Sequence, residues 1–408
     1  MANVDRTQLW QTVQAVLASS ESPATDNRPA TAPFGLIAVP IGIRLLSDQL
    51  TPVLAYRRLV APDERAATSF LLESVEASGQ GRYSLLGSRP AIEVTAKGDR
   101  VSVAATEPRS SGPRAMPAWA LERLIAAGTR TDVGTGPTDP ADTLRRVTSA
   151  VRFVRPDASH PSAALPDAPV GGWFGYAGYD TARYGEPGKL GFDRAPVDDR
   201  NLPDLAFALY SGATVFDHVQ KLVHIVELAW IDPAWINPDE RNRASCDAEH
   251  DRVLAVLDER AFELEQHSKP LPSGRIRAES AAPDGTPPPP PGRSDTTEAD
   301  YHTMVERALE YIRAGDIFQV VLGQRFERTS HADPFDVYRA LRAVNPSPYM
   351  AYMQCPGCIL VASSPEILCR VERAAGFPSR HELTRVPLIK PADKLAGFAI
   401  KDAIDGMG

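Results

Sequence analysis

Cysteine, basic clusters and long apolar runs are all scarce in this sequence. Its 408 residues contain 4 cysteines, too few for a disulfide scaffold, so a reducing cytoplasm is the expected location. The longest apolar run, Leu36–Ile43, is interrupted by Pro40 and Gly42 and is far shorter than the ~18 residues that cross a bilayer. The N-terminus also lacks the features of a secretory signal. Net charge is −8 without any Lys/Arg-rich block, so neither a membrane nor a nucleic-acid partner is expected.

Proline, by contrast, is abundant. The 37 prolines include five in a row, Pro287–Pro291, within a Ser-, Gly- and Asp-containing stretch. Because proline lacks a backbone donor and this stretch offers little apolar surface, residues 268–298 are predicted to be an extended linker. A well-ordered surface excursion is the alternative. At ~100–200 residues per domain, the length allows two or three units or one interleaved body.

Before the linker, apolar periodicity predicts two β-rich stretches and a helix. Short apolar runs alternate with turn signals from 34 to 103, which predicts a sheet of antiparallel strands. A variable excursion around one helix is expected over 105–140, and a second β-rich stretch begins at 171. An amphipathic helix is expected over 245–266. Its buried face should carry Val253, Val256, Leu257 and Leu264.

After the linker, the pattern predicts a helix, a strand, a second helix and a hairpin. Thr297 and Asp300 form a capping pair for a helix that ends near Ala314, and Gly315 suits a left-handed C-terminal position. One face of this helix carries Tyr301, Val305, Ala308 and Ile312. Residues 317–326 are then predicted to be a buried strand, 334–344 a helix, and Pro356–Gly357 the turn of a hairpin.

The motif Cys355-Pro-Gly-Cys358 has the spacing of metal and redox sites. A zinc site needs two further ligands, and Cys246 and Cys369 do not form a second pair. A thioredoxin-like role needs a βαβ setting, whereas this motif is predicted at the top of a hairpin. Neither metal binding nor redox catalysis is therefore expected from it.

Seven segments, in order, resemble the large subunit of anthranilate synthase. They are DQLTPVLAYRRL (48–59), SFLLESVEASGQGRYSLLG (69–87), GGWFGYAGYDTARYGE (171–186), LPDLAFALYSGATVFDHVQK (202–221), YIRAGDIFQVVLGQRF (311–326), NPSPYMAYMQ (345–354) and ASSPEIL (362–368). The resemblance implies an α+β fold, in which two intertwined antiparallel sheets carry outer helices, incomplete at the C-terminal side. We interpret the glycine-rich third segment as structural, at the domain interface, since it lacks the Lys-Ser/Thr ending of a phosphate loop.

The resemblance also implies a reaction and its partners. Enzymes of this family convert chorismate and ammonia to anthranilate and pyruvate with Mg²⁺, in tryptophan biosynthesis. A separate glutamine amidotransferase subunit supplies the ammonia, and L-tryptophan inhibits by feedback. The predicted division of the chain follows from this. It comprises a polar N-terminal segment (1–33), an N-terminal domain with the tryptophan-site segment (34–267), the linker (268–298), the start of a chorismate-binding domain (299–370) and a divergent tail (371–408).

Four residues correspond to the family's tryptophan site. They are Ser74 in the LLES segment and Pro348, Tyr349 and Met350 in NPSPYM. A hydroxyl and free backbone groups at a strand end can bind an ammonium and a carboxylate, while proline and aromatic faces hold an indole. Without the resemblance, a polar strand end and a helix-to-strand turn would explain the same residues.

Two residues correspond to the family's catalytic positions. Loss of the chorismate hydroxyl needs a proton donor, and Glu366 in SSPE lies where the family has its general acid. Gln319 lies where relatives that add water have a lysine. An amide cannot deprotonate water, which agrees with ammonia as the nucleophile. A backbone-bonded amide and a helix N-terminal carboxylate are the structural alternatives for Gln319 and Glu366.

The family's later motifs are not recognisable after about Arg370. Those motifs include the chorismate loop and the acidic magnesium ligands, and the ion organises substrate charge. The chain alone is therefore expected to make little or no anthranilate. Two other functions stay open: that of the aminodeoxychorismate synthase large subunit, and that of a non-catalytic protein that binds tryptophan or docks an amidotransferase.

Overall fold

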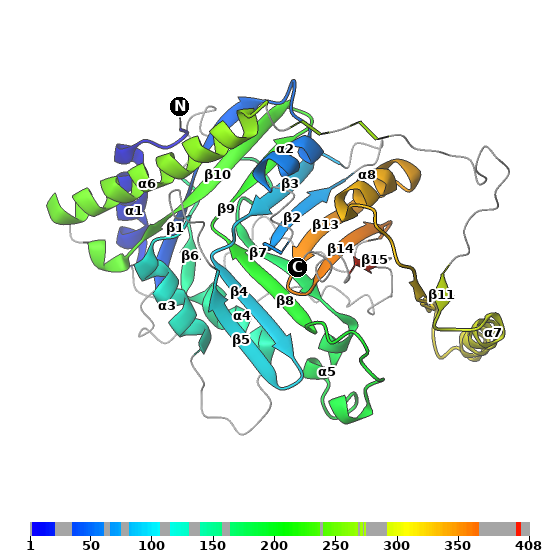
Figure 1. The fold of residues 1–408 in the computed structure, drawn as a ribbon. Helices are drawn as coiled ribbons and strands as arrows, with labels where there is room; N and C mark the ends of the chain where they lie inside the picture. The colour runs from blue at the N-terminus through cyan, green and yellow to red at the C-terminus, as the bar shows by residue number, and fades with distance from the viewer. Residues whose placement is uncertain are drawn as a thin grey trace.

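The fold of the computed structural model is α+β, built on two sheets and a small ribbon. Figure 1 shows the two sheets with helices on their outer sides. The structure describes residues 2–20, 35–60, 66–74, 81–106, 115–129, 139–156, 164–236, 240–267, 270–271, 273–274, 292–366 and 397–400. The proline run and most of the predicted tail lie outside these residues.

The larger sheet has nine strands in the order β15-β14-β13-β2-β3-β9-β10-β1-β6. Neighbouring strands are antiparallel, except that β1 and β6 are parallel. Because β13 pairs with β2, segments from both sides of the proline run share one sheet. The strands are β1 (Leu36–Leu46), β2 (Ser69–Glu73), β3 (Tyr83–Ser88), β6 (Val151–Phe153), β9 (Gly212–Asp217), β10 (Leu222–Ile231), β13 (Tyr349–Cys355), β14 (Cys358–Ser364) and β15 (Gly397–Ile400).

The second sheet has four strands in the order β5-β4-β8-β7, all antiparallel. They are β4 (Ile92–Lys97), β5 (Arg100–Ala105), β7 (Gly172–Ala177) and β8 (Leu205–Tyr210). The prediction of one sheet over 34–103 is therefore wrong, although its strands exist. The chain leaves the nine-stranded sheet after β3 and turns at Arg89, whose φ is 56°. Apolar alternation identifies the buried face of a strand, but not the sheet to which it belongs.

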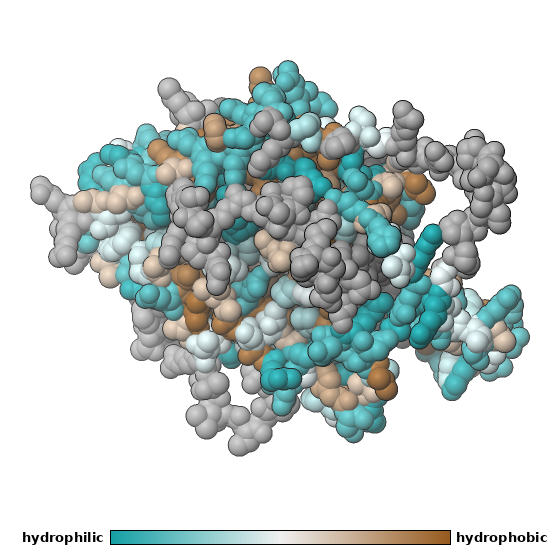
Figure 2. Space-filling view, in the orientation of Figure 1, coloured by the Kyte–Doolittle hydropathy of each residue, from teal (hydrophilic) through white to brown (hydrophobic). Residues whose placement is uncertain are grey.

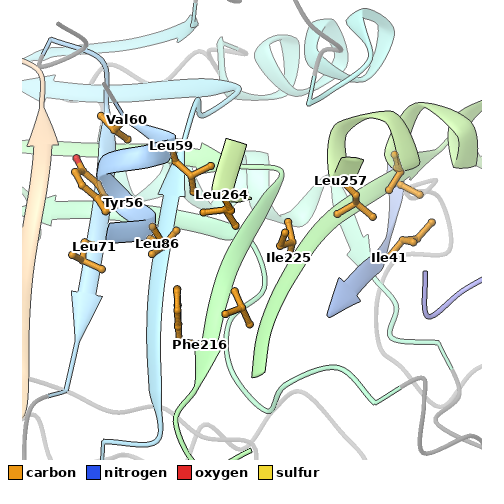
Figure 3. Packing of buried hydrophobic residues seen from close by; sticks show 14 of the residues in the cluster. Ile41, Tyr56, Leu59, Val60, Leu71, Leu86, Phe216, Ile225, Leu257 and Leu264 are labelled. Carbon is orange, nitrogen blue, oxygen red and sulfur yellow. The ribbon is translucent and has the colours of Figure 1, made fainter. Parts of the chain in front are cut away.

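Helices cover the outer face of the nine-stranded sheet. Side chains from α1 (Arg6–Ser20), α2 (Pro52–Leu59), α6 (Glu240–Glu265) and α8 (Pro334–Val344) join one apolar core with its strands. Figure 3 shows this packing, with Tyr56 of α2 near Leu71 of β2, and Leu257 of α6 near Ile225 of β10. The predicted face of α6 is confirmed, since all four of its apolar residues are buried.

The excursion predicted around one helix contains α3 (Ala118–Thr129) and is followed by a second helix, α4 (Pro140–Ser149). Asp139 caps α4 by accepting from the amide of Ala141. Side chains of α3 and α4 pack with β1 and the four-stranded sheet in a second core.

Aromatic rings join the two sheets face to face. Phe70 of β2 stacks on Phe174 of β7 with centroids 4.0 Å apart, and Tyr210 meets both rings edge-on. Gly175, beside Phe174, lies so close to β8 that an added Cβ would be 2.0 Å from the carbonyl oxygen of Ala206. The interpretation of the glycine-rich segment as structural is thereby confirmed.

The segment that follows the proline run stands apart from the sheets. Figure 1 shows α7 (Glu298–Ala314) well away from them, and Figure 2 shows the same lobe projecting from the molecule. Its predicted caps are confirmed: Thr297 accepts from the amide of Asp300, and Gly315 has φ 80°. However, none of its side chains is buried.

The predicted buried strand over 317–326 is wrong. Phe318 is 96% exposed, and only Phe326–Glu327 forms a strand, β12, which pairs with β11 (Arg293–Ser294). A continuous apolar run indicates a strand only where another surface covers it, and the described residues do not cover this one. Arg325 ties the segment to the rest of the chain by a two-point ion pair with Asp199, at 3.0 and 2.7 Å.

Candidate functional site

The predicted site residues converge on one end of the nine-stranded sheet, where β2 ends, β13 begins and β14 ends. Met350 lies opposite Glu73, and Tyr349 lies opposite Ser364. Ser74 directly follows Glu73, so it lies beside Tyr349. The tryptophan-site segments and the SSPE segment therefore meet at one sheet end, although Ser74 and Glu366 are 292 positions apart in sequence. We call this the β13 site.

The alternation of side chains divides the β13 site between two faces of the sheet. Met350 is 1% exposed and packs in the core under the helices. Tyr349 shares its face with Ala351, and Ser74 shares its face with Leu72, both of which pack towards the four-stranded sheet. Tyr349 is 42% exposed. Tyr349 and Ser74 can thus touch a ligand, whereas Met350 supports the strand from the opposite face.

Pro348 is half-buried and directly precedes β13. The preceding residue, Ser347, is buried, and its hydroxyl has no hydrogen-bond partner among the described residues. A buried hydroxyl without a partner loses its hydration, so this turn has an unused donor close to Tyr349.

A buried carboxylate supports the site from the helix-covered face, and sequence reasoning missed it. Glu73 is 5% exposed. It accepts hydrogen bonds from the Tyr338 hydroxyl (2.7 Å) and from Arg342 Nη2 (2.9 Å). The Nε atom of Arg342 also lies 2.7 Å from this carboxylate. Burial, and then the charge of Glu73, raise the pKa of Tyr338 well above its usual value. The sequence did offer one indication of this arrangement. Tyr338 and Arg342 are four residues apart, which places both on one face of α8.

A histidine lies on the other side of Glu73. Ser84 continues the β2–β3 register opposite Glu73, and its hydroxyl is 2.7 Å from His218 Nε2. Burial lowers the pKa of His218, with the Glu73 charge acting in the opposite direction. The ring is therefore neutral at pH 7, and the contact between Ser84 and His218 is a neutral hydrogen bond that adds to the pairing of β3 with β9.

Glu366 follows the end of β14. Its amide donates to Ser364 Oγ at 3.4 Å, and that hydroxyl donates to the Glu366 carbonyl oxygen at 2.8 Å. Ser363 donates to the carbonyl oxygen of Asn345 at 2.7 Å, which fixes the end of α8 against β14. These bonds hold the backbone of SSPE at the β13 site.

Gln319 is not brought to this site. It lies exposed in the irregular segment between α7 and β12, and no hydrogen bond joins it to Glu366. Over the described ranges, no three His, Cys, Asp or Glu side chains are grouped so as to hold a metal ion. In the same ranges, no helix has the length and apolarity to cross a membrane.

The profile of a family described as chorismate binding enzymes matches residues 110–377. The chain therefore belongs to the chorismate-binding enzyme family.

Particular relatives are named as anthranilate synthases. The chain is 41% identical over 361 residues to anthranilate synthase alpha subunit 1, chloroplastic, of Oryza sativa subsp. indica, which covers 84% of this chain and 54% of the relative. It is 41% identical over 339 residues to the Arabidopsis thaliana alpha subunit 1 (82% and 51%) and 34% identical over 343 residues to component 1 of Thermus thermophilus (80% and 55%). The chain spans about half the length of these relatives.

A crystal structure of anthranilate synthase component I from Streptococcus pneumoniae also matches. It has a TM-score of 0.40 and 22% sequence identity, and the match covers 81% of this chain and 59% of that one.

Proposed function

We propose that this protein is a large subunit of anthranilate synthase, converting chorismate and ammonia to anthranilate and pyruvate. The observation that carries the proposal is the 41% identity to relatives named as anthranilate synthase alpha subunits, over 361 residues. The family match supports chorismate as the substrate. A glutamine amidotransferase subunit is the proposed source of ammonia, L-tryptophan the proposed inhibitor, Mg²⁺ the proposed cofactor, and the cytoplasm the proposed location.

Glu366 is the proposed general acid. Its backbone is fixed beside β14, so its carboxyl group can be presented to a ring hydroxyl that leaves as water. Gln319 can orient ammonia but cannot serve as a base, which suits a nucleophile that needs no deprotonation by the protein. For both to act together, the segment around Gln319 must close on the β13 site. Because Gln319 is exposed here, we expect the chain alone to turn over slowly.

The test is anthranilate fluorescence from chorismate, ammonium and Mg²⁺, with product identity checked by mass. We expect slow formation of anthranilate that Glu366→Gln reduces by at least ~100-fold, the lower range for a general acid. Gln220→Glu, a change of the same size on an exposed turn, is the matched control. Formation of aminodeoxychorismate would assign the chain to the related synthase instead. Turnover unaffected by Glu366→Gln would remove Glu366 from the chemistry.

Tryptophan binding without turnover is the second candidate, favoured by the β13 site itself. Tyr349 and Ser74 lie side by side on an accessible face, and Glu73 is held from behind. Titration calorimetry with L-tryptophan tests this. We expect heat of binding that Tyr349→Ala abolishes and that exposed Phe318→Ala leaves unchanged. No heat with the folded chain would exclude this candidate.

A further inference from the structure

The two cysteines of the CxxC motif, Cys355 and Cys358, lie opposite each other at the turn of the β13–β14 hairpin. Cys355 ends β13, Cys358 begins β14, and the register pairs the two directly across the turn. Pro356 and Gly357 are the two turn residues, and Gly357 has φ 79°, as the third position of a type II turn requires. Both cysteines are free thiols and both are buried.

This geometry brings the two sulfurs within reach of each other. Directly opposed residues of antiparallel strands have Cα atoms ~4.5–5.5 Å apart, inside the ~4.4–6.8 Å range of disulfides. Their Cβ atoms are ~4.5–5.5 Å apart, about 1 Å more than a typical disulfide. We infer that Cys355 and Cys358 form a reversible disulfide bond, which makes the hairpin turn a site of oxidative modification.

The surroundings decide which thiol reacts first. Cys355 lines a crevice between the two sheets, together with Thr68, Glu93 and Phe174. Cys358 is completely buried. Cys355 is therefore the more accessible of the two thiols, at 7% exposed, so we assign it the first attack and Cys358 the role of resolving thiol.

The reaction is a thiol–disulfide exchange with a low-molecular-weight disulfide. The Cys355 thiolate attacks one sulfur of the reagent, whose S–S bond breaks to release one thiolate, leaving a mixed disulfide on Cys355. The Cys358 thiolate then attacks the Cys355 sulfur and releases the second reagent thiolate. Overall, the two cysteines lose two protons and two electrons, and the reagent disulfide becomes two thiols.

Burial makes the exchange slow at neutral pH. It raises the pKa of both Cys355 and Cys358 above that of a free thiol, and only the thiolate attacks. The rate should therefore increase with pH up to at least pH 9. The same environment makes this a modification site and not a catalytic dithiol.

The oxidised turn would lie beside the four-stranded sheet. Burial, with a further contribution from both cysteines, raises the pKa of Tyr176 on β7, and the Tyr176 hydroxyl donates to the carbonyl oxygen of Pro203 at 2.9 Å. The disulfide therefore fixes the hairpin turn next to this contact between the sheets.

Peptide mapping of the full chain tests the proposal. Reduced protein is freed of reductant, incubated with 2-hydroxyethyl disulfide at pH 7 and pH 9, alkylated, and cleaved with trypsin and Glu-C. Cleavage after Arg342 and Glu366 gives a peptide that contains Cys355 and Cys358 but not Cys369. We expect this peptide to be unalkylated and two hydrogens lighter than its reduced form. The oxidised peptide should form faster at pH 9 than at pH 7, and dithiothreitol should restore the reduced form.

Single variants separate the steps. Cys358→Ser should stop at a mixed disulfide on Cys355, and Cys246→Ser, a change at a buried cysteine on α6, should leave the internal bond unaffected. Two alkylated thiols after prolonged incubation at pH 9, or separate reagent adducts on both cysteines of the wild-type chain, would overturn the inference.

Discussion

The hairpin of β13 and β14 and the segment from β11 to β12 both follow the proline run, and both carry apolar sequence, yet they reach opposite environments. In the hairpin, Tyr352 is 1% exposed, whereas Phe318 in the other segment is 96% exposed. The hairpin has β2 beside it and α8 above it. An apolar pattern therefore becomes core only where a partner surface is available.

The largest expected effect comes from emptying the core of the hairpin. Tyr352 meets the rings of Tyr56 and Phe335 edge-on, at centroid distances of 5.4 and 5.1 Å. Tyr352→Ala should lower the free energy of unfolding by about 3–5 kcal/mol, the usual range for aromatic truncation in a core. Phe318→Ala, the matched truncation in the exposed segment, should change it by less than about 0.5 kcal/mol. Urea unfolding measures both, and equal effects would invalidate the comparison.

A smaller effect is expected from the polar support of the β13 site. Among the described residues, Arg342→Ala leaves Glu73 with the Tyr338 hydroxyl as its hydrogen-bond donor. Loss of a hydrogen bond to a buried charge costs about 1.5–3 kcal/mol. Arg339→Ala, on the same helix, removes a pair with exposed Asp336 and should cost below about 1 kcal/mol. Thermal melting compares them. A greater loss in Arg339→Ala would contradict the assigned role of Arg342.

In the exposed segment, the helix cap should matter only locally. Gly315 has φ 80°, so Gly315→Ala should cost α7 about 1 kcal/mol through left-handed strain. Gly323→Ala, in the same segment and in open space, is the control. Hydrogen exchange of the last α7 amides should increase only in Gly315→Ala, with the global unfolding transition unchanged. A shifted global transition would mean that α7 is coupled to the sheets.

The smallest effect is a pH dependence near the β13 site. The folded-state pKa of His218 is lowered, so the unfolded chain binds a proton more readily. Stability should therefore decrease as pH falls below about 6.5, the ordinary histidine pKa. His218→Gln should flatten this decrease, and His302→Gln, at an exposed position on α7, should not. The difference between the denaturation midpoints at pH 5.5 and pH 7.5, measured for the wild type and both variants, tests this prediction.

The sequence predicted individual elements well where local chemistry specifies them. The caps of α7, the buried face of α6 and the Pro356–Gly357 turn all follow from short-range rules and are confirmed. The division of strands between two sheets, and the exposure of residues 317–325, depend on distant partners that periodicity does not encode. For the same reason, Glu73 was missed, because its partners lie on α8, more than 260 positions away. The roles of Ser74, Pro348, Tyr349, Met350, Gln319 and Glu366 stay predictions.

The pairing of β13 with β2 has a consequence for how the chain folds. Met350 must find Glu73 across a separation of 277 positions, and contacts of high sequence separation form late. During synthesis on the ribosome, the edge of β2 stays open until the hairpin emerges, and an open edge invites pairing with other chains. Nascent chains should accordingly depend on chaperones until translation has passed β14.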